Sequence, residues 1–114
     1  MTKSGVKEKS DLMPGTLDML ILKTLTRGVM HGYGIAQHIK LLSEEVLQVE
    51  EGSLYPALQR LQLQGWVASD WAQSENNRRA RYYRLTPEGK RRLEQEVTQF
   101  DRLVGAIGRV MRTA

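Results

Sequence analysis

Apolar residues recur at helical spacing along the first half of the chain. In "PGTLDMLILKTLTRG", positions 14–28, they cover almost the whole circumference of the expected helix, which is typical of a helix buried on two sides. A second, shorter helix is expected in "MHGYGIAQHIKLLSEEVLQ", positions 30–48, after a Gly-rich entry. A third is expected in "EGSLYPALQRLQLQGW", positions 51–66. Gly52 or Ser53 can cap this third helix, and Pro56 in its first turn would break no needed hydrogen bond.

After Gly65 the pattern changes to aromatic and β-branched residues. The segments "WVASDW" and "ARYYRLT" predict the two strands of a β-hairpin around the polar tip "AQSENNRR". Because neighbouring side chains on a strand point to opposite faces, one of Tyr82 and Tyr83 is expected in the core and the other is free for function. Thr86 as N-cap and Pro87 at the first helical position then begin a long helix that runs nearly to Ala114.

The apolar residues of this last helix alternate in steps of four and three, which is the pattern of a coiled-coil seam. A helix of about 25 residues reaches on the order of 37 Å and would overhang so small a body. The pattern therefore favours a dimer interface over a helix that folds back on its own domain. The predicted seam comprises Leu93, Val97, Phe100, Val104, Ile107 and Met111.

The order of three helices, a hairpin and a long helix predicts a mainly α (α+β) fold, namely a winged helix-turn-helix with a long C-terminal dimerisation helix. We expect residues 1–13 to form a flexible polar leader, 14–86 the DNA-binding domain and 87–114 the dimerisation helix. A chain of 114 residues can bury one modest core and has no room for a second, catalytic domain.

Composition narrows the function further. The net charge of +4 and the pI near 9.6 favour an anionic partner. The absence of cysteine excludes disulfides, thiol catalysis and thiolate metal sites. No apolar run is long enough to span a bilayer, so a soluble cytoplasmic chain is expected, with no membrane partner. His31 and His38 lack metal-ligand spacing, and no serine has a base and acid in pattern, so we expect no metal, no cofactor and no enzymatic activity.

The third helix is the expected reader of DNA, because the second helix of a helix-turn-helix places its outer face in the major groove. With Leu54, Leu58 and Leu61 on the inner face, Arg60 can pair with guanine and Gln59 with adenine. Leu63 also projects outward and is expected to touch another element. The candidate contacts on this helix are Ser53, Tyr55, Pro56, Gln59 and Arg60.

The tip of the hairpin is the second expected contact, along the phosphates or in the minor groove. Its candidate residues are Asn77, Arg78, Arg79 and Arg81. The alternative is a solvated tip, but the lack of acidic residues from Asn76 to Thr86 favours binding. Lys90, Arg91 and Arg92 follow closely in sequence and could extend a basic edge.

Four segments resemble the PadR family of winged-helix transcriptional regulators. They are "GTLDMLILKTL", "HGYGIAQHI", "EEGSLYPALQRLQLQGW" and "RRARYYRLTPEGKRRL", between residue 15 and about residue 95. The resemblance implies a homodimeric repressor of an inverted-repeat operator, with some members released by small aromatic or hydrophobic ligands. By position it carries DNA contact over to Tyr33, Ser53, Tyr55, Pro56, Arg78 and Arg79.

Many relatives carry several helices after the wing, whereas this chain has one, so it resembles the short branch of the family. Two alternatives to a plain DNA-binding repressor stay open. One is a winged-helix module whose third helix docks on a partner protein. The other is a DNA-binding protein that also senses a small hydrophobic ligand between subunits, although the spacing of Trp66, Trp71 and Phe100 defines no pocket for it.

Overall fold

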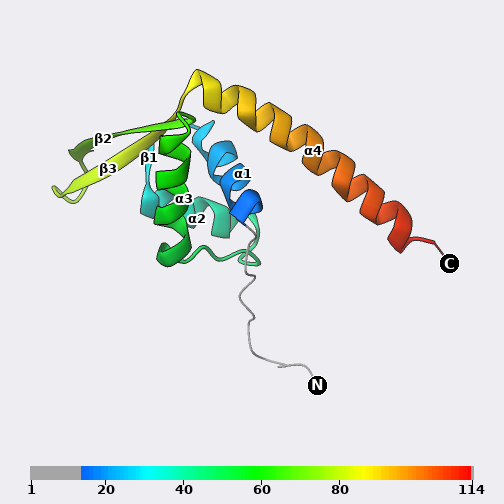
Figure 1. The fold of residues 1–114 in the computed structure, drawn as a ribbon. Coiled ribbons are helices and arrows are strands. Elements are labelled where there is room, and N and C mark those ends of the chain that lie inside the picture. The colour runs from blue at the N-terminus through cyan, green and yellow to red at the C-terminus, as the bar shows by residue number, and fades with distance from the viewer. Residues whose placement is uncertain (1–13, 114) are drawn as a thin grey trace.

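The computed structural model describes residues 14–113, and two elements project from the packed helices (Figure 1). The hairpin of β2 (Val67–Gln73) and β3 (Arg79–Leu85) projects on one side, and α4 (Pro87–Met111) leaves on the other. The expected leader, residues 1–13, lies outside the described residues. The predicted α+β winged-helix architecture is confirmed. The elements are α1 (Pro14–Leu25), β1 (Met30–His31), α2 (Gly32–Leu42), α3 (Glu51–Leu63), β2 (Val67–Gln73), β3 (Arg79–Leu85) and α4 (Pro87–Met111).

One hydrophobic core joins the first three helices to the sheet. Helix α1 is buried on two sides, as its pattern predicts, and it contacts α2, α3, α4 and β3. Burying one large apolar side chain stabilises the fold by about 1.5–3 kcal/mol, so the contacts between α1 and α3 fix α3 against α1. The fully buried large side chains are Ile21, Leu22, Ile35, Leu54, Leu58 and Leu61.

The sheet has three antiparallel strands in the order β1-β3-β2, one more than the predicted hairpin. Strand β1 is only Met30 and His31, which pair with Tyr83 and Tyr82. A pair of residues before a Gly-rich helix entry has no visible alternation, and its extended form depends on pairing with β3. Tyr83 is 5% exposed and belongs to the core, whereas Tyr82 is partly exposed, which confirms the predicted split between the two tyrosines.

The start of α3 differs from its prediction. Glu50 is the N-cap, without a side-chain cap hydrogen bond, and its carbonyl accepts from the N–H groups of Ser53 and Leu54 at 3.0 and 2.9 Å. Gly52 and Ser53 therefore lie inside the first turn, so neither is the cap. Pro56 falls in the second turn and has no N–H to donate to the carbonyl of Gly52. Both residues are exposed, so water can take the place of the missing donor.

The start of α4 agrees with its prediction. The Thr86 hydroxyl accepts from the N–H of Gly89 at 3.0 Å and donates to the carbonyl of Gly65 at 2.7 Å. One side chain thus joins the turn after α3 to the first turn of α4. Gly89 packs so closely there that a Cβ at this position would lie 2.0 Å from the carbonyl oxygen of Trp66. Only glycine permits this approach.

Beyond Glu96, which still borders α1, the helix α4 leaves the body (Figure 1). Leu93 corrects the predicted seam, because it is 6% exposed and packs in the chain's own core. The exposed part of the seam therefore begins at Val97. Within residues 14–113, none of the helices combines the length and the apolar character that crossing a membrane requires. The exposed apolar residues of α4 are Val97, Phe100, Leu103, Val104, Ile107, Val110 and Met111.

Candidate nucleic-acid interface

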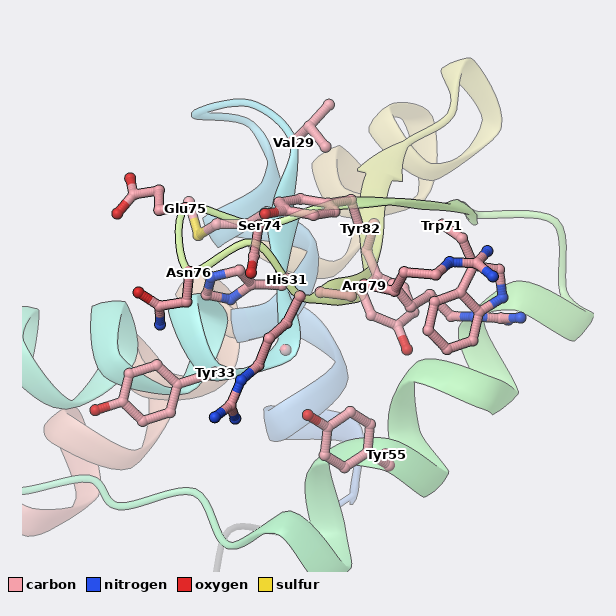
Figure 2. Close-up of a pocket in the computed structure, with 16 residues that line it drawn as sticks. Val29, His31, Tyr33, Tyr55, Trp71, Ser74, Glu75, Asn76, Arg79 and Tyr82 are labelled. Atoms are coloured by element: carbon pink, nitrogen blue, oxygen red, sulfur yellow. The ribbon is translucent and has the colours of Figure 1, made fainter.

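A concave face with a volume of about 790 Å³ opens between the β2–β3 hairpin and the beginnings of α2 and α3 (Figure 2). Aromatic rings and guanidinium groups from four elements meet on it. Aromatic faces stack on bases and sugars and arginines bind phosphates, so this combination suits a nucleic acid. The residues that give this character are Tyr33, Tyr55, Trp71, Arg79, Arg81 and Tyr82.

The outer side of α3 presents the predicted contact residues, since Ser53, Tyr55, Pro56, Gln59 and Arg60 are all exposed. Tyr55 lies on the flank that faces the hairpin (Figure 2). Its ring packs on Gly32, where an added Cβ would come within 2.6 Å of the hydroxyl oxygen. The absence of a side chain on Gly32 therefore lets Tyr55 sit between α2 and α3. Leu63 is 82% exposed, so the expected contact with another element is wrong.

Arg60 is exposed but not free. Its Nη2 donates to Oδ1 of Asp18 on α1 at 2.9 Å, and the two side chains are 46% and 26% exposed. Burial raises the pKa of Asp18 above its ordinary value, the hydrogen bond and charge of Arg60 lower it by less, and Glu96 adds to the rise. The sequence prediction missed Asp18, and its one signal is a carboxylate within an otherwise apolar helix.

The arginines of the hairpin are held in another way. Arg79 and Arg81 lie over the ring of Trp71, with 5.2 and 5.0 Å between each guanidinium carbon and the ring centroid. Trp71 pairs with Arg81 in the sheet, so alternation places all three on the face that carries buried Tyr83. Within the described residues, no carboxylate forms an ion pair with either arginine. Trp71 was not among the predicted DNA contacts.

The tip of the hairpin is shaped by Asn77. This residue has a φ of 62°, in the left-handed region that asparagine tolerates better than most residues. Its side-chain oxygen accepts from the amide of Gln73, and the N–H of Ser74 donates to the carbonyl of Arg78 at 2.6 Å. Asn77 thus forms the turn, while Arg78 is exposed at its end.

The entry to α2 is built by His31, whose Nδ1 accepts from the N–H of Gly34 at 2.9 Å. His31 is therefore the N-cap of α2. Tyr33 follows and is largely exposed at the edge of the concave face (Figure 2). In the described part of the chain, no group of three or more His, Cys, Asp or Glu side chains could hold a metal ion.

The expected basic edge at the start of α4 is largely neutralised. Arg91 pairs with Glu88 at 3.3 Å. Arg92 pairs with Glu96 at 2.6 Å and lies over the ring of Trp66, 4.8 Å from its centroid. Arg92 thus packs beside the core and not along the hairpin. The candidate interface therefore lies on α3 and on the β2–β3 hairpin (Val67–Leu85), which we call the wing, and not on α4.

The family model and two solved structures that are similar to this chain are all described as transcriptional regulators. The model of a family described as "Transcriptional regulator PadR-like family" matches residues 21–95. A transcriptional regulator from Clostridium thermocellum is similar over 88% of this chain and 97% of its own, with 32% identity and a TM-score of 0.79. A PadR family transcriptional regulator from Eggerthella lenta is 34% identical and covers 88% of this chain and 85% of its own, with a TM-score of 0.74. An uncharacterized protein X from Lysinibacillus sphaericus is 29% identical over 92 residues, which are 81% of this chain and 84% of that protein.

Proposed function

This chain belongs to the PadR-like family of transcriptional regulators, and we propose that it acts as a homodimeric repressor that binds a specific sequence of double-stranded DNA. The observation that carries the proposal is the concave face, where the aromatic rings and arginines of the hairpin adjoin the exposed side of α3. Both surfaces can meet one DNA duplex at the same time. A module that docks only on a protein has no need for this arginine cluster beside α3.

In the proposed complex α3 lies in the major groove. Its exposed positions include Gln59, whose amide can bond adenine, and Arg60, whose guanidinium can bond guanine. Ser53 and Tyr55 lie nearer the helix N-terminus, where a hydroxyl can reach a phosphate. The buried face of α3, which includes Leu54, belongs to the core, and α3 packs on α1, so the exposed face has a fixed direction.

The hairpin supplies charge at a second point of the duplex. In the proposed complex, Arg78 at the exposed tip and Arg79 and Arg81 on Trp71 lie along the sugar-phosphate backbone or in the minor groove. Contacts of this kind add affinity for all DNA and make binding depend steeply on salt. Specificity would then come from α3 and affinity largely from the wing.

Dimer formation is supported by α4. Its apolar side stays exposed for more than half of the helix, while the same side is buried at Leu93. A second copy of α4 would cover this surface by coiled-coil packing. The resulting pair would present two copies of α3 to two half-sites, about one or two helical turns apart, as in an inverted repeat.

The experiment that tests this function is selection of bound fragments from the source genome by the purified protein. The enriched fragment is then titrated at about 50 and about 200 mM salt, beside random DNA of the same length. We expect a short inverted repeat that binds at least about 1000-fold more tightly than random DNA. In vitro transcription from a promoter that contains this repeat should fall when the protein is added.

Weak and even binding to every fragment would overturn the proposal. It would leave a winged helix whose basic surface serves another purpose, and the exposed Leu63 on α3 would then direct attention to a protein partner.

A further inference from the structure

The ion pair between Asp18 and Arg60 joins two elements that are far apart in sequence. The residues are 42 positions apart, and the 2.9 Å contact links α1 to α3 across the surface of the core. Asp18 lies between Leu17 and Met19, which are both buried. The Asp18 side chain lies where α1 borders both α3 and the start of α4, in contact with Arg60 and beside Arg92 and Glu96.

Stability alone does not account for this carboxylate. Burial, with the charge of Glu96, raises the pKa of Asp18, and the hydrogen bond and charge of Arg60 do not fully offset that rise. The charged form is therefore less well solvated in the folded chain than in the unfolded chain. Partly buried ion pairs are often no better for stability than neutral residues of the same size. A role in holding Arg60 explains the pair better.

The place of Arg60 on α3 decides which of its N–H donors Asp18 can hold. On α3, at about 100° per residue, Arg60 lies on the flank of the exposed side that faces α1, whereas Pro56 and Gln59 lie nearer its middle. A guanidinium has five N–H donors in one plane, and the contact to Asp18 uses one nitrogen, Nη2. The remaining donors are left for a base edge while this one nitrogen is held on α1. A fixed fork loses less freedom when it binds a base edge than a free side chain does.

We propose that Asp18 is a specificity-determining positioning residue, which fixes the guanidinium plane of Arg60 and thereby sets the base that α3 prefers at one position of the site. The inference rests on the proposed DNA binding. Asp18 itself touches no DNA and acts through Arg60. Its negative charge also opposes phosphates, so its removal should have opposite effects on specific and on random DNA.

The surroundings of Asp18 permit a conservative test. It borders a small cavity of about 90 Å³ together with Trp66, Arg92 and Glu96. An asparagine has the same shape as aspartate and fits there without repacking, but it carries no charge to hold Arg60. Asp18→Asn is therefore the informative variant, and Arg60→Lys keeps the positive charge while losing the planar fork.

The experiment compares the base preferences of the wild type, Asp18→Asn, Arg60→Lys, Arg60→Ala and the double variant Asp18→Asn/Arg60→Ala, from selection on a randomised site. We expect Asp18→Asn to lower the ratio of preferred-site to random-DNA affinity about tenfold, which is about 1.4 kcal/mol. Preference should relax at the same base pair as in Arg60→Lys, while affinity for random DNA stays equal or rises. The double variant should match Arg60→Ala alone.

A matched control is Asp70→Asn. It removes the carboxylate of another ion pair, on the hairpin, where Nε of Arg84 lies 3.8 Å from Oδ2 of Asp70. It makes the same change in net charge, and its preference at every base should equal that of the wild type. Unchanged preferences in Asp18→Asn would overturn the inference, as would losses that add to those of Arg60→Ala. If the wild type itself selects no site, both the proposed function and this inference fail, and that result is distinct from a wild type that selects a site unaffected by Asp18.

Discussion

Helix α3 and the wing hold arginines of the same chemistry in two different ways. Arg60 donates to a carboxylate on another helix, which holds one nitrogen of its guanidinium and cancels part of its charge. Arg79 and Arg81 lie on the face of Trp71, which supports the flat groups and leaves their charge unpaired. Arg81 also donates from Nη1 to the hydroxyl of Ser69 at 3.3 Å, and its other N–H groups stay available. A directed fork suits recognition of one base, whereas a supported charge suits any phosphate.

The difference also separates two contributions to binding. An arginine whose charge is balanced by a neighbouring carboxylate adds little to long-range attraction, because the pair appears neutral at a distance. Two arginines that share one indole add their full charge. We therefore expect changes on α3 to alter which sequence is bound, and changes on the wing to alter how strongly all DNA is bound.

The largest effect should come from disrupting the proposed dimer, because the dimer brings two copies of α3 and of the hairpin to the two half-sites. Replacing Val97 and Val104 with Glu places charges in the exposed seam and should yield monomers, since a buried unpaired carboxylate is costly. Affinity for the inverted repeat should then fall about 100-fold or more, because each half-site binds alone. Analytical ultracentrifugation and DNA titration measure both results.

The matched control replaces Gln95 and Thr98 with Glu, which makes the same change in charge on the opposite side of α4. This variant should remain dimeric. A Val97→Glu/Val104→Glu protein that sediments as a dimer would remove the seam from the interface.

A smaller effect is expected from the wing. Replacing Arg79 and Arg81 with Ala should weaken binding to the preferred site and to random DNA alike, by roughly tenfold, and should reduce the slope of log affinity against log salt by roughly two. The control is Arg84→Ala, because Arg84 lies on the other face of β3 and pairs with Asp70. A slope equal to that of the wild type would place the two arginines outside the DNA complex.

Trp71→Ala sharpens the same comparison, because it removes the support and keeps both charges. We expect an affinity loss of only about threefold, in line with the roughly 0.5–1 kcal/mol of an exposed cation–π contact. The salt slope should not change. A reduced slope would mean that the indole is needed to bring the charges to the phosphates.

The smallest effect concerns the contribution of Asp18, the partner of Arg60, to the free energy of unfolding. Because the pKa of Asp18 is raised on folding, the folded chain binds this proton more tightly than the unfolded chain does. The stabilisation is present below the ordinary value of 3.8 and is lost as pH rises through the folded value. The groups that act on this carboxyl are Arg60 and Glu96.

Near neutral pH, the free energy of unfolding of Asp18→Asn should therefore equal that of the wild type or exceed it by up to about 1 kcal/mol. This difference should shrink on acidification. Urea unfolding from about pH 3 to about pH 7 measures it. A clear loss of stability in the variant at neutral pH would show that the ion pair stabilises the fold, contrary to its assignment as a positioning contact.

Local signals explain the parts of the fold that the sequence predicts. Thr86 and Pro87 begin α4 as expected, because a cap and a proline act within one turn. The spacing of Leu54, Leu58 and Leu61 likewise places the buried face of α3. The exposure of Ser53, Tyr55 and Gln59 follows from that face alone.

Contacts between distant segments explain the parts that were missed. Met30 and His31 become a strand only because Tyr83 and Tyr82 are there to pair with them. The partner of Arg60 lies on α1, and the ring under Arg92 belongs to Trp66, which no spacing rule connects. Leu93 has the period of the seam but lies where α4 still touches the body, so periodicity could not assign it to the core.

The joint formed by Thr86 and Gly89 has a consequence for changes in chain length. Each residue inserted into α4 after Leu93 would advance the helix by about 1.5 Å and rotate all that follows by about 100°. Because the first turn is fixed against Trp66, the whole rotation would fall on the exposed part of the helix. Substitutions in α4 leave its phase intact, but a single insertion would turn Val97 and Val104 away from a partner. In the proposed dimer, the number of residues in this helix therefore sets the separation of the two reading helices.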